Sequence, residues 1–216
     1  MSTTSYRIGA AAAAVVIVLT GSQASAAPAA GGAGTRVPVP EFRPGPTARV
    51  TGSADVRLTY WPDSDVRTFT FDAVGRPYSR PMPDLPGGLP TDASGTVRIA
   101  HRVAEQDVTV RMVARVDCLA TGPGVAVLTA VVTEADELAR DELGRRLGFS
   151  VYDAGRHGGP DRVGFSWSVV NAEQDEDGTW GRADVGTCLG PGPFAPVVRG
   201  DYTVRHQDLL PAPTGG

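Results

Sequence analysis

The sequence predicts an all-β protein, an antiparallel β-sandwich of about seven or eight short strands, with a small β-barrel as the alternative. Three observations support this fold class. Segments of alternating apolar and polar residues recur through residues 48–206, turn-forming residues separate them, and little of the chain has helical spacing. The alternation predicts strands but cannot reveal whether the sheet closes on itself, so both architectures stay open.

The clearest strand is expected at residues 107–118. Its even-numbered residues are apolar and end at Cys118, whereas most of its odd-numbered residues are polar or charged. Successive side chains of a strand point to opposite faces, so this segment predicts a half-buried strand of an antiparallel sheet. The same alternation places Cys118 on the buried face.

The remaining elements follow from the same patterns. Residues 52–61 and 66–71 flank Pro62-Asp63-Ser64-Asp65 and predict a hairpin. Residues 75–94 contain five prolines and predict a long surface loop. Residues 134–146 predict a short surface helix, in which Glu142 and Arg146 stand at helical spacing. Further strands are expected at 96–103, 125–133, 146–152, 162–170, around Cys188 and at 201–206.

The N-terminal residues have the pattern of an export signal. Arg7 precedes the apolar run Ile8–Thr20, and Ala24-Ser25-Ala26 supplies a cleavage pattern, so we expect a signal peptide over 1–26. The run is too short for a membrane anchor, which was the alternative. We expect the secreted chain to comprise an Ala/Gly/Pro-rich linker at 27–47, a β-domain at 48–206 and a flexible tail at 207–216.

Export changes how the two cysteines are interpreted. In a secreted chain, Cys118 and Cys188 most simply form one disulfide. The alternatives are two free buried thiols or a metal site, and the latter is disfavoured because the three histidines are scattered.

Charge and composition exclude several functions. All basic residues are arginine, so lysine chemistry such as a Schiff base is excluded. The formal net charge of −4 argues against nucleic acid as a partner. No Gly-x-Ser-x-Gly nucleophile motif is present in the sequence. His101 and His206 lie on the same strand face as apolar neighbours, so we expect each to be a partly buried, hydrogen-bonded histidine and not a catalytic base. We therefore expect a protein that is not an enzyme.

The best candidate for chemistry is a calcium loop at residues 173–184. Glu173, Asp175 and Asp177 stand at alternate positions, Gly178 follows at position six, and Asp184 is at position twelve. Such spacing lets oxygen atoms wrap a hard cation, with the glycine making the turn. Glu173 at position one and the short Asp184 depart from the usual pattern and predict weak binding. The alternative is a solvated acidic loop that binds no metal.

Two tryptophans are candidates for a binding platform. Trp61 lies next to the predicted turn and Trp180 lies in the acidic loop. Exposed aromatic rings can stack on sugars or on a partner's side chains, whereas the alternative is that both rings cover the ends of the core.

Several runs of the sequence resemble a family of secreted streptomycete proteins often labelled repetin-like. The resemblance covers most of the chain after the signal and implies export, a β-fold and the cysteine pair, but no active site. The runs that carry it are GSADVRLTYWPDSDVRTFTFDA (52–73), RVDCLA (115–120), GFSVYDAG (148–155), DRVGFSW (161–167), DGTWG (177–181) and YTVRH (202–206).

The sequence therefore favours a secreted, non-enzymatic β-domain with an extracellular binding or structural role toward a polymer or a protein. Two alternatives remain: a secreted hydrolase that acts on a polymer through carboxylates, and a β-barrel that binds a small apolar ligand. A filled core with only shallow grooves would favour the first function, a convergent pair of carboxylates in a cleft the second, and a closed interior cavity the third.

Overall fold

The computed structural model describes residues 47–155, 158–166 and 170–213. The chain divides into two units, Met1–Glu41 and Phe42–Gly216, and all the described residues lie in the second. The predicted signal peptide, most of the predicted linker, His157 and Trp167 lie outside the described residues. Within the part of the chain that is described, no helix has the length and apolar character needed to span a membrane.

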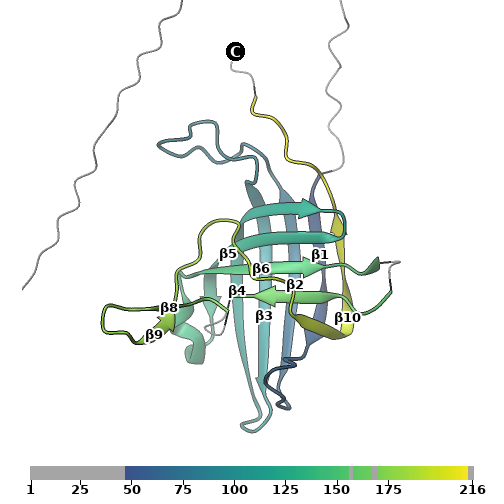
Figure 1. Ribbon diagram of the computed structural model, residues 1–216, viewed down its shortest axis with the longest axis vertical. Helices are drawn as coiled ribbons and strands as arrows, with labels where there is room; N and C mark the ends of the chain where they lie inside the picture. The colour runs from purple at the N-terminus through teal and green to yellow at the C-terminus, as the bar shows by residue number, and fades with distance from the viewer. Residues whose placement is uncertain (1–46, 156–157, 167–169, 214–216) are drawn as a thin grey trace, which may run out of the picture. The chain divides into compact units, whose positions relative to one another are not determined.

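Eight strands form a closed antiparallel β-barrel (Figure 1). Each barrel strand pairs with the next one along the chain, and the last pairs with the first, so the chain runs up and down around the barrel. The strands are β1 (Arg49–Val56), β2 (Val66–Gly75), β3 (Ala93–Val103), β4 (Val108–Gly122), β5 (Val125–Ala135), β6 (Arg146–Tyr152), β7 (Arg162–Phe165) and β10 (Ala195–Arg205). The all-β prediction and the strand at 146–152 are confirmed.

The predicted sandwich is wrong, and the alternative barrel is correct. Closure depends on bending that the alternation does not encode. Gly52 and Gly95 lie in their strands with φ of 130° and 129°. A Cβ at Gly52 would stand 2.3 Å from the carbonyl oxygen of Asp201, and one at Gly95 would stand 2.0 Å from that of Asp72. These close approaches let the strands coil sharply, as a small closed barrel requires.

An aromatic core fills the barrel. Phe69 stacks on Phe165 with ring centroids 4.8 Å apart and meets the ring of Phe149 edge-on at 6.1 Å. Phe71 contacts both Phe149 and Tyr202, at 5.6 and 5.3 Å. Offset and edge-on pairs are the favoured geometries of aromatic rings, so this chain of contacts packs the interior closely.

Strand β10 meets β7 over a short seam. The two strands pair through Ala195–Val163 and Pro196–Arg162, and beyond this point side chains take over. Asp161 Oδ2 accepts a hydrogen bond from the Tyr202 N–H at 2.7 Å, and Asp153 Oδ2 accepts one from the Val204 N–H at 2.9 Å. Two carboxylates thus replace part of a backbone ladder.

The disulfide is confirmed, but Cys118 lies on the other face of its strand from the predicted one. The register of β4 against β5 shifts between Val116 and Cys118, so one extra residue is inserted there. Cys118 then pairs with Thr129, whereas the core-facing Leu119 pairs with Leu128. Cys118 therefore points outward and bonds to Cys188, with their Cα atoms 5.4 Å apart.

An extended segment, residues 183–194, covers this outward-facing patch, and we call it the strap. The backbone N–H of Cys188 donates to Thr129 Oγ1 at 3.2 Å, and Arg162 Nε donates to the Pro193 carbonyl at 2.8 Å. Figure 1 shows the strap crossing β6 and β7 before it enters β10. The strand predicted around Cys188 is wrong, because this segment bonds to side chains and lies across the strands rather than alongside one.

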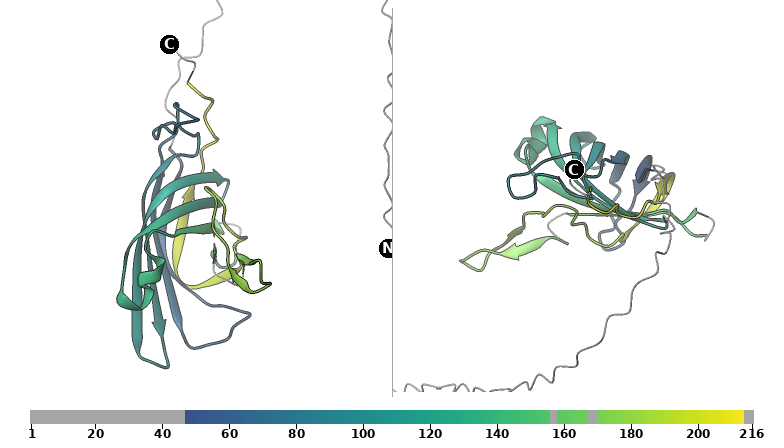
Figure 2. Two further views of the ribbon diagram at one scale, coloured as in Figure 1. Left: turned by 90° about the vertical axis from the view of Figure 1, so that its left-hand side faces the viewer. Right: turned by 90° about the horizontal axis from the view of Figure 1, so that it is seen from above.

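Two elements lie outside the barrel wall. The predicted helix at 134–146 is a 3₁₀ helix of six residues, η1 (Glu137–Glu142), with non-helical dihedral angles at Ala139. The acidic segment predicted as a loop contains a small hairpin, β8 (Ala172–Gln174) and β9 (Trp180–Arg182). Figure 2 shows this hairpin projecting from the barrel. Its strands are too short to produce a visible alternation.

Candidate functional site

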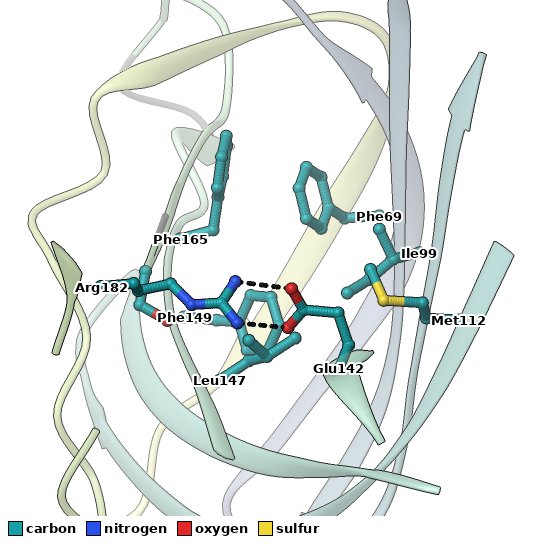
Figure 3. Close-up of a pocket in the computed structure, with 9 residues that line it drawn as sticks. Phe69, Ile99, Met112, Glu142, Leu147, Phe149, Phe165 and Arg182 are labelled. Atoms are coloured by element: carbon teal, nitrogen blue, oxygen red, sulfur yellow. Dashed lines mark hydrogen bonds and ion pairs between the residues drawn. The ribbon is translucent and has the colours of Figure 1, made fainter. Parts of the chain in front are cut away.

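A pocket opens at one end of the barrel, which we call the mouth. The mouth carries the β1–β2 loop (57–65), η1 and the segment that leads from β7 to β10. One wall of the pocket is a row across three neighbouring strands, in which Phe69 pairs with Ile99 and Ile99 with Met112 (Figure 3). Further lining comes from β6, β7 and the residue after it: Leu147, Phe149, Phe165 and Ser166.

An ion pair covers the pocket. The two terminal guanidinium nitrogens of Arg182, Nη1 and Nη2, donate to Oε1 and Oε2 of Glu142, each at 2.7 Å. Their side chains are 17% and 16% exposed, so the pair is largely shielded from water. Glu142 ends η1 and Arg182 ends β9, so the barrel wall contributes neither charge (Figure 3). The two-bond geometry is the strongest form of an arginine–carboxylate contact.

The pocket is small and partly open to solvent in this state. About 310 Å³ of the pocket is not occupied by atoms, and this volume includes space that is open to solvent. The part that admits water is about 20 Å³, which is room for about one water molecule. A molecule larger than water can therefore bind only if side chains around the pocket move, and the Glu142–Arg182 pair is the part of the lining that lies outside the barrel wall.

Aromatic rings continue from the pocket to the surface. Phe165 packs against Phe194 with centroids 5.0 Å apart, and Phe194 packs against Tyr60 at 5.9 Å. Tyr60 belongs to the β1–β2 loop and is 44% exposed, and its partial burial raises the pKa of its phenol. One side of the mouth is thus apolar from Phe69 out to solvent.

A charged cluster lies at the same end of the barrel. Arg67 and His101 are paired residues of β2 and β3, two positions beyond the pair Phe69–Ile99 on the same inward face. Arg67 makes two hydrogen bonds to Asp63, at 3.0 and 2.6 Å. Asp65 binds His101 Nε2 at 2.7 Å and the backbone N–H of Ala104 at 2.9 Å. The β1–β2 loop therefore turns its carboxylates toward the barrel interior.

These carboxylates are unsuited to donate a proton near neutral pH. The hydrogen bonds from Arg67 hold the pKa of Asp63 below its ordinary value, and the Ala104 N–H does the same for Asp65, assisted by His101. A general acid needs a raised pKa instead. The cluster fits a structural role, in which the loop neutralises a buried arginine.

The residues of the predicted calcium loop lie on the β8–β9 hairpin and just after it. Glu173 is in β8, and Asp184 follows β9. Asp175 Oδ1 accepts the backbone N–H groups of Asp177 and Thr179, at 3.1 and 2.8 Å, and so shapes the turn. Within residues 47–155, 158–166 and 170–213, no group of three or more His, Cys, Asp or Glu side chains is arranged to hold a metal ion. Calcium binding stays a prediction.

Both tryptophans of the predicted binding platform are exposed. Trp61 lies in the β1–β2 loop and is 66% exposed, and Trp180 begins β9 and is 67% exposed. Neither ring covers the core, so the alternative interpretation of these residues is wrong. Their role in binding stays a prediction.

The residues of the cover were missed by sequence reasoning. The spacing of Glu142 and Arg146 suggested that they belong to one helix, but Glu142 binds Arg182, and Arg146 binds the buried Asp117 at 2.8 Å. Glu142 and Arg182 are 40 positions apart in the sequence, so no local pattern signals their contact. The one available hint is that Arg182 is the single basic residue in an otherwise acidic segment, 171–184.

Comparison of the chain with protein-family models, with curated proteins and with solved structures finds no match. The geometry of the mouth is therefore the feature that indicates a function.

Proposed function

We propose that this protein is a non-enzymatic binding protein that takes a small apolar molecule into the mouth of its barrel. The observation that carries the proposal is the Glu142–Arg182 pair, which covers an apolar pocket from outside the barrel wall. Ligand sites in proteins are concave and mostly apolar, with few polar groups, and occur in the mouths of β-barrels. Displacement of the cover would expose Phe69, Ile99 and Met112 without disturbing the strand ladder.

We propose further that the protein acts outside the cell. The Cys118–Cys188 disulfide supports this location, because such bonds persist in oxidising compartments. The predicted signal peptide points the same way.

The hydrolase alternative has less support. Asp63 and Asp65 converge at the mouth, but their pKa values are lowered and their oxygens are engaged by Arg67, His101 and backbone N–H groups. A glycosidase pair needs one carboxyl group that stays protonated near neutral pH.

The binding proposal is tested with the neutral dye N-phenyl-1-naphthylamine, whose fluorescence rises in an apolar site. We expect saturable binding with a dissociation constant on the order of 100 µM, from about 0.3 kcal/mol for each non-hydrogen atom. Met112→Trp, which fills the pocket, should weaken binding at least tenfold. The matched control is Leu138→Trp, which adds the same ring at a residue of η1 that is 68% exposed.

Each variant is first checked by thermal melting and near-ultraviolet circular dichroism, because overpacking of a core destabilises by about 1–3 kcal/mol. If Met112→Trp does not fold, Leu147→Phe fills the same pocket with a smaller change. Absence of dye binding to the wild-type protein would overturn the proposal. Equal binding to the wild-type protein and to a folded, filled variant would also overturn it.

A further inference from the structure

We infer that the ligand of this pocket is an apolar carboxylic acid, whose carboxylate replaces that of Glu142 on Arg182. This inference rests on the proposed function and specifies the class of ligand. It follows from the chemistry of the cover, from the way in which each partner of the ion pair is held, and from the apolar walls behind the pair.

The cover presents a site already shaped for a carboxylate. Arg182 donates two parallel hydrogen bonds to the two oxygens of one carboxyl group, each 2.7 Å long. An incoming carboxylate can reproduce both bonds, so exchange leaves the arginine satisfied. A neutral ligand that displaced Glu142 would leave a shielded guanidinium without its partner, so we expect a neutral molecule to bind more weakly than a carboxylate with the same tail.

Arg182 is held through the hairpin that carries it. The residue after it, Ala183, is held by Asn171: the Ala183 N–H donates to the Asn171 carbonyl at 2.9 Å, and Asn171 Nδ2 donates to the Ala183 carbonyl at 2.7 Å. Five residues farther along the chain, Cys188 is bonded to the barrel. The backbone that carries Arg182 is therefore held within the β8–β9 hairpin and tethered to the barrel through Cys188.

Glu142 can leave the pair by rotation of its side chain. Its backbone is held, because the Glu142 carbonyl accepts the Arg145 N–H at 3.0 Å and the Gly144 N–H donates to the Val132 carbonyl at 2.9 Å. The next residue, Leu143, is 46% exposed, so solvent lies close to the Glu142 side chain. A carboxylate is unfavourable at the C-terminal end of a helix, where the backbone carbonyls point. Once released, Glu142 would regain water at the rim of the mouth.

The walls behind the pair determine the rest of the ligand. Phe69, Phe149 and Met112 line the pocket, and methionine adapts its shape to different apolar groups. An alkyl or aromatic tail would enter between these side chains, with its carboxylate at Arg182. An apolar pocket with a charged group at its opening thus matches a molecule that is charged at one end and apolar at the other.

A cationic ligand on Glu142 is the competing possibility, because the nearby hairpin is acidic. The carboxylates of Glu173, Asp175 and Asp177 are exposed, however. Solvent and salt therefore screen their charge at distances beyond about 8 Å. An ammonium group would also replace the planar two-bond contact by a point charge. The short-range geometry at Arg182 therefore favours the anion.

The experiment measures displacement of N-phenyl-1-naphthylamine at pH 7.5 by three competitors with one tail: decanoate, decanamide and decylammonium, each below its micellar concentration. We expect decanoate to bind at least tenfold more tightly than either of the others. Arg182→Gln should abolish this preference. Glu142→Gln should strengthen decanoate binding several-fold, because the internal competitor is gone.

Arg49→Gln is the matched control, since its ion pair with Asp72 is exposed and neither residue lines the pocket. If Arg182→Gln does not fold, the opposite change expected in Glu142→Gln still tests the inference. Displacement by decylammonium at least as tight as by decanoate, or a preference unchanged in the variants, would overturn it while leaving the proposed function intact. Failure of the dye to bind at all would overturn the proposed function first.

Discussion

Arg67 is an arginine inside a barrel. It occupies the inward row that continues into Phe69, is 7% exposed, and is neutralised by Asp63 and Asp65 from the β1–β2 loop. A buried charge without a partner is strongly destabilising, whereas a paired one is tolerated. These two aspartates therefore fold the loop over the mouth.

Replacing Asp63 should reveal this role through pH dependence. The pKa values of Asp63 and Asp65 are lowered, so the stability they contribute is present above about pH 4, the ordinary pKa of aspartate, and is lost as the pH falls through their folded values. Asp63→Asn should lower the free energy of unfolding by about 1–3 kcal/mol at pH 6. This loss is smaller than for a buried arginine with one partner, because Asp65 still lies 3.4 Å from Arg67.

The measurement is urea unfolding between pH 2 and pH 6. The difference between the wild-type protein and Asp63→Asn should shrink as the pH falls below about 4. Asp72→Asn, which removes an exposed carboxylate, should stay close to wild type at every pH. A constant difference for Asp63→Asn across the whole range would contradict the electrostatic role.

At the scale of elements, the seam between β10 and β7 is the least regular part of the barrel. Asp161 joins three segments there: its carboxylate accepts the N–H groups of Ala154 and Tyr202, and its carbonyl accepts that of Val197. Closure of the barrel at this point depends on the carboxylates of Asp161 and Asp153, where a strand ladder would ordinarily use backbone bonds.

Asp161→Ala should therefore destabilise the barrel. Two backbone N–H donors lose their acceptor, and each buried unsatisfied donor lowers the free energy of unfolding by about 1–3 kcal/mol. Hydrogen exchange should accelerate most at Tyr202 and Val204, next to the seam, and least in β3 and β4 on the far side of the sheet order. Asp72→Ala is the control, as an exposed carboxylate on β2. Uniform acceleration in all strands would show that the seam does not open separately.

At the scale of the whole molecule, the disulfide joins the strap to the outside of the barrel. Cys118 and Cys188 are 70 residues apart in sequence, and a loop of that length is expected to stabilise by roughly 4 kcal/mol through the entropy of the unfolded chain. Because Cys118 points away from the core, the barrel interior does not depend on the bond for packing.

A Cys118→Ser, Cys188→Ser variant should keep the barrel but lose about 2–5 kcal/mol of unfolding free energy. Its far-ultraviolet circular dichroism should match the wild-type spectrum, whereas exchange of the strap amides should rise sharply. Cys118→Ser alone would leave a reactive thiol, so the double variant is the cleaner test. Loss of the β spectrum would contradict the placement of the disulfide outside the core.

The sequence by itself determined the local features of this protein. Period-two alternation predicted antiparallel strands, and 146–152 was confirmed in full, because the alternation reports the two faces of a strand wherever that strand lies. The pairing of Cys118 with Cys188 followed from their number and the predicted export. The exposed Trp61 and Trp180 were recognised as candidates, although nothing in the pattern placed them in space.

Only the tertiary structure decided closure, strand facing and the candidate site. A sandwich and a barrel have the same in-out alternation, so the bends at Gly52 and Gly95 and the seam at Asp161 were needed to distinguish them. One inserted residue before Cys118 reversed its face, because the period of two leaves no tolerance for an insertion. Glu142 and Arg182 meet across 40 residues, since a contact made by folding has no counterpart in local periodicity.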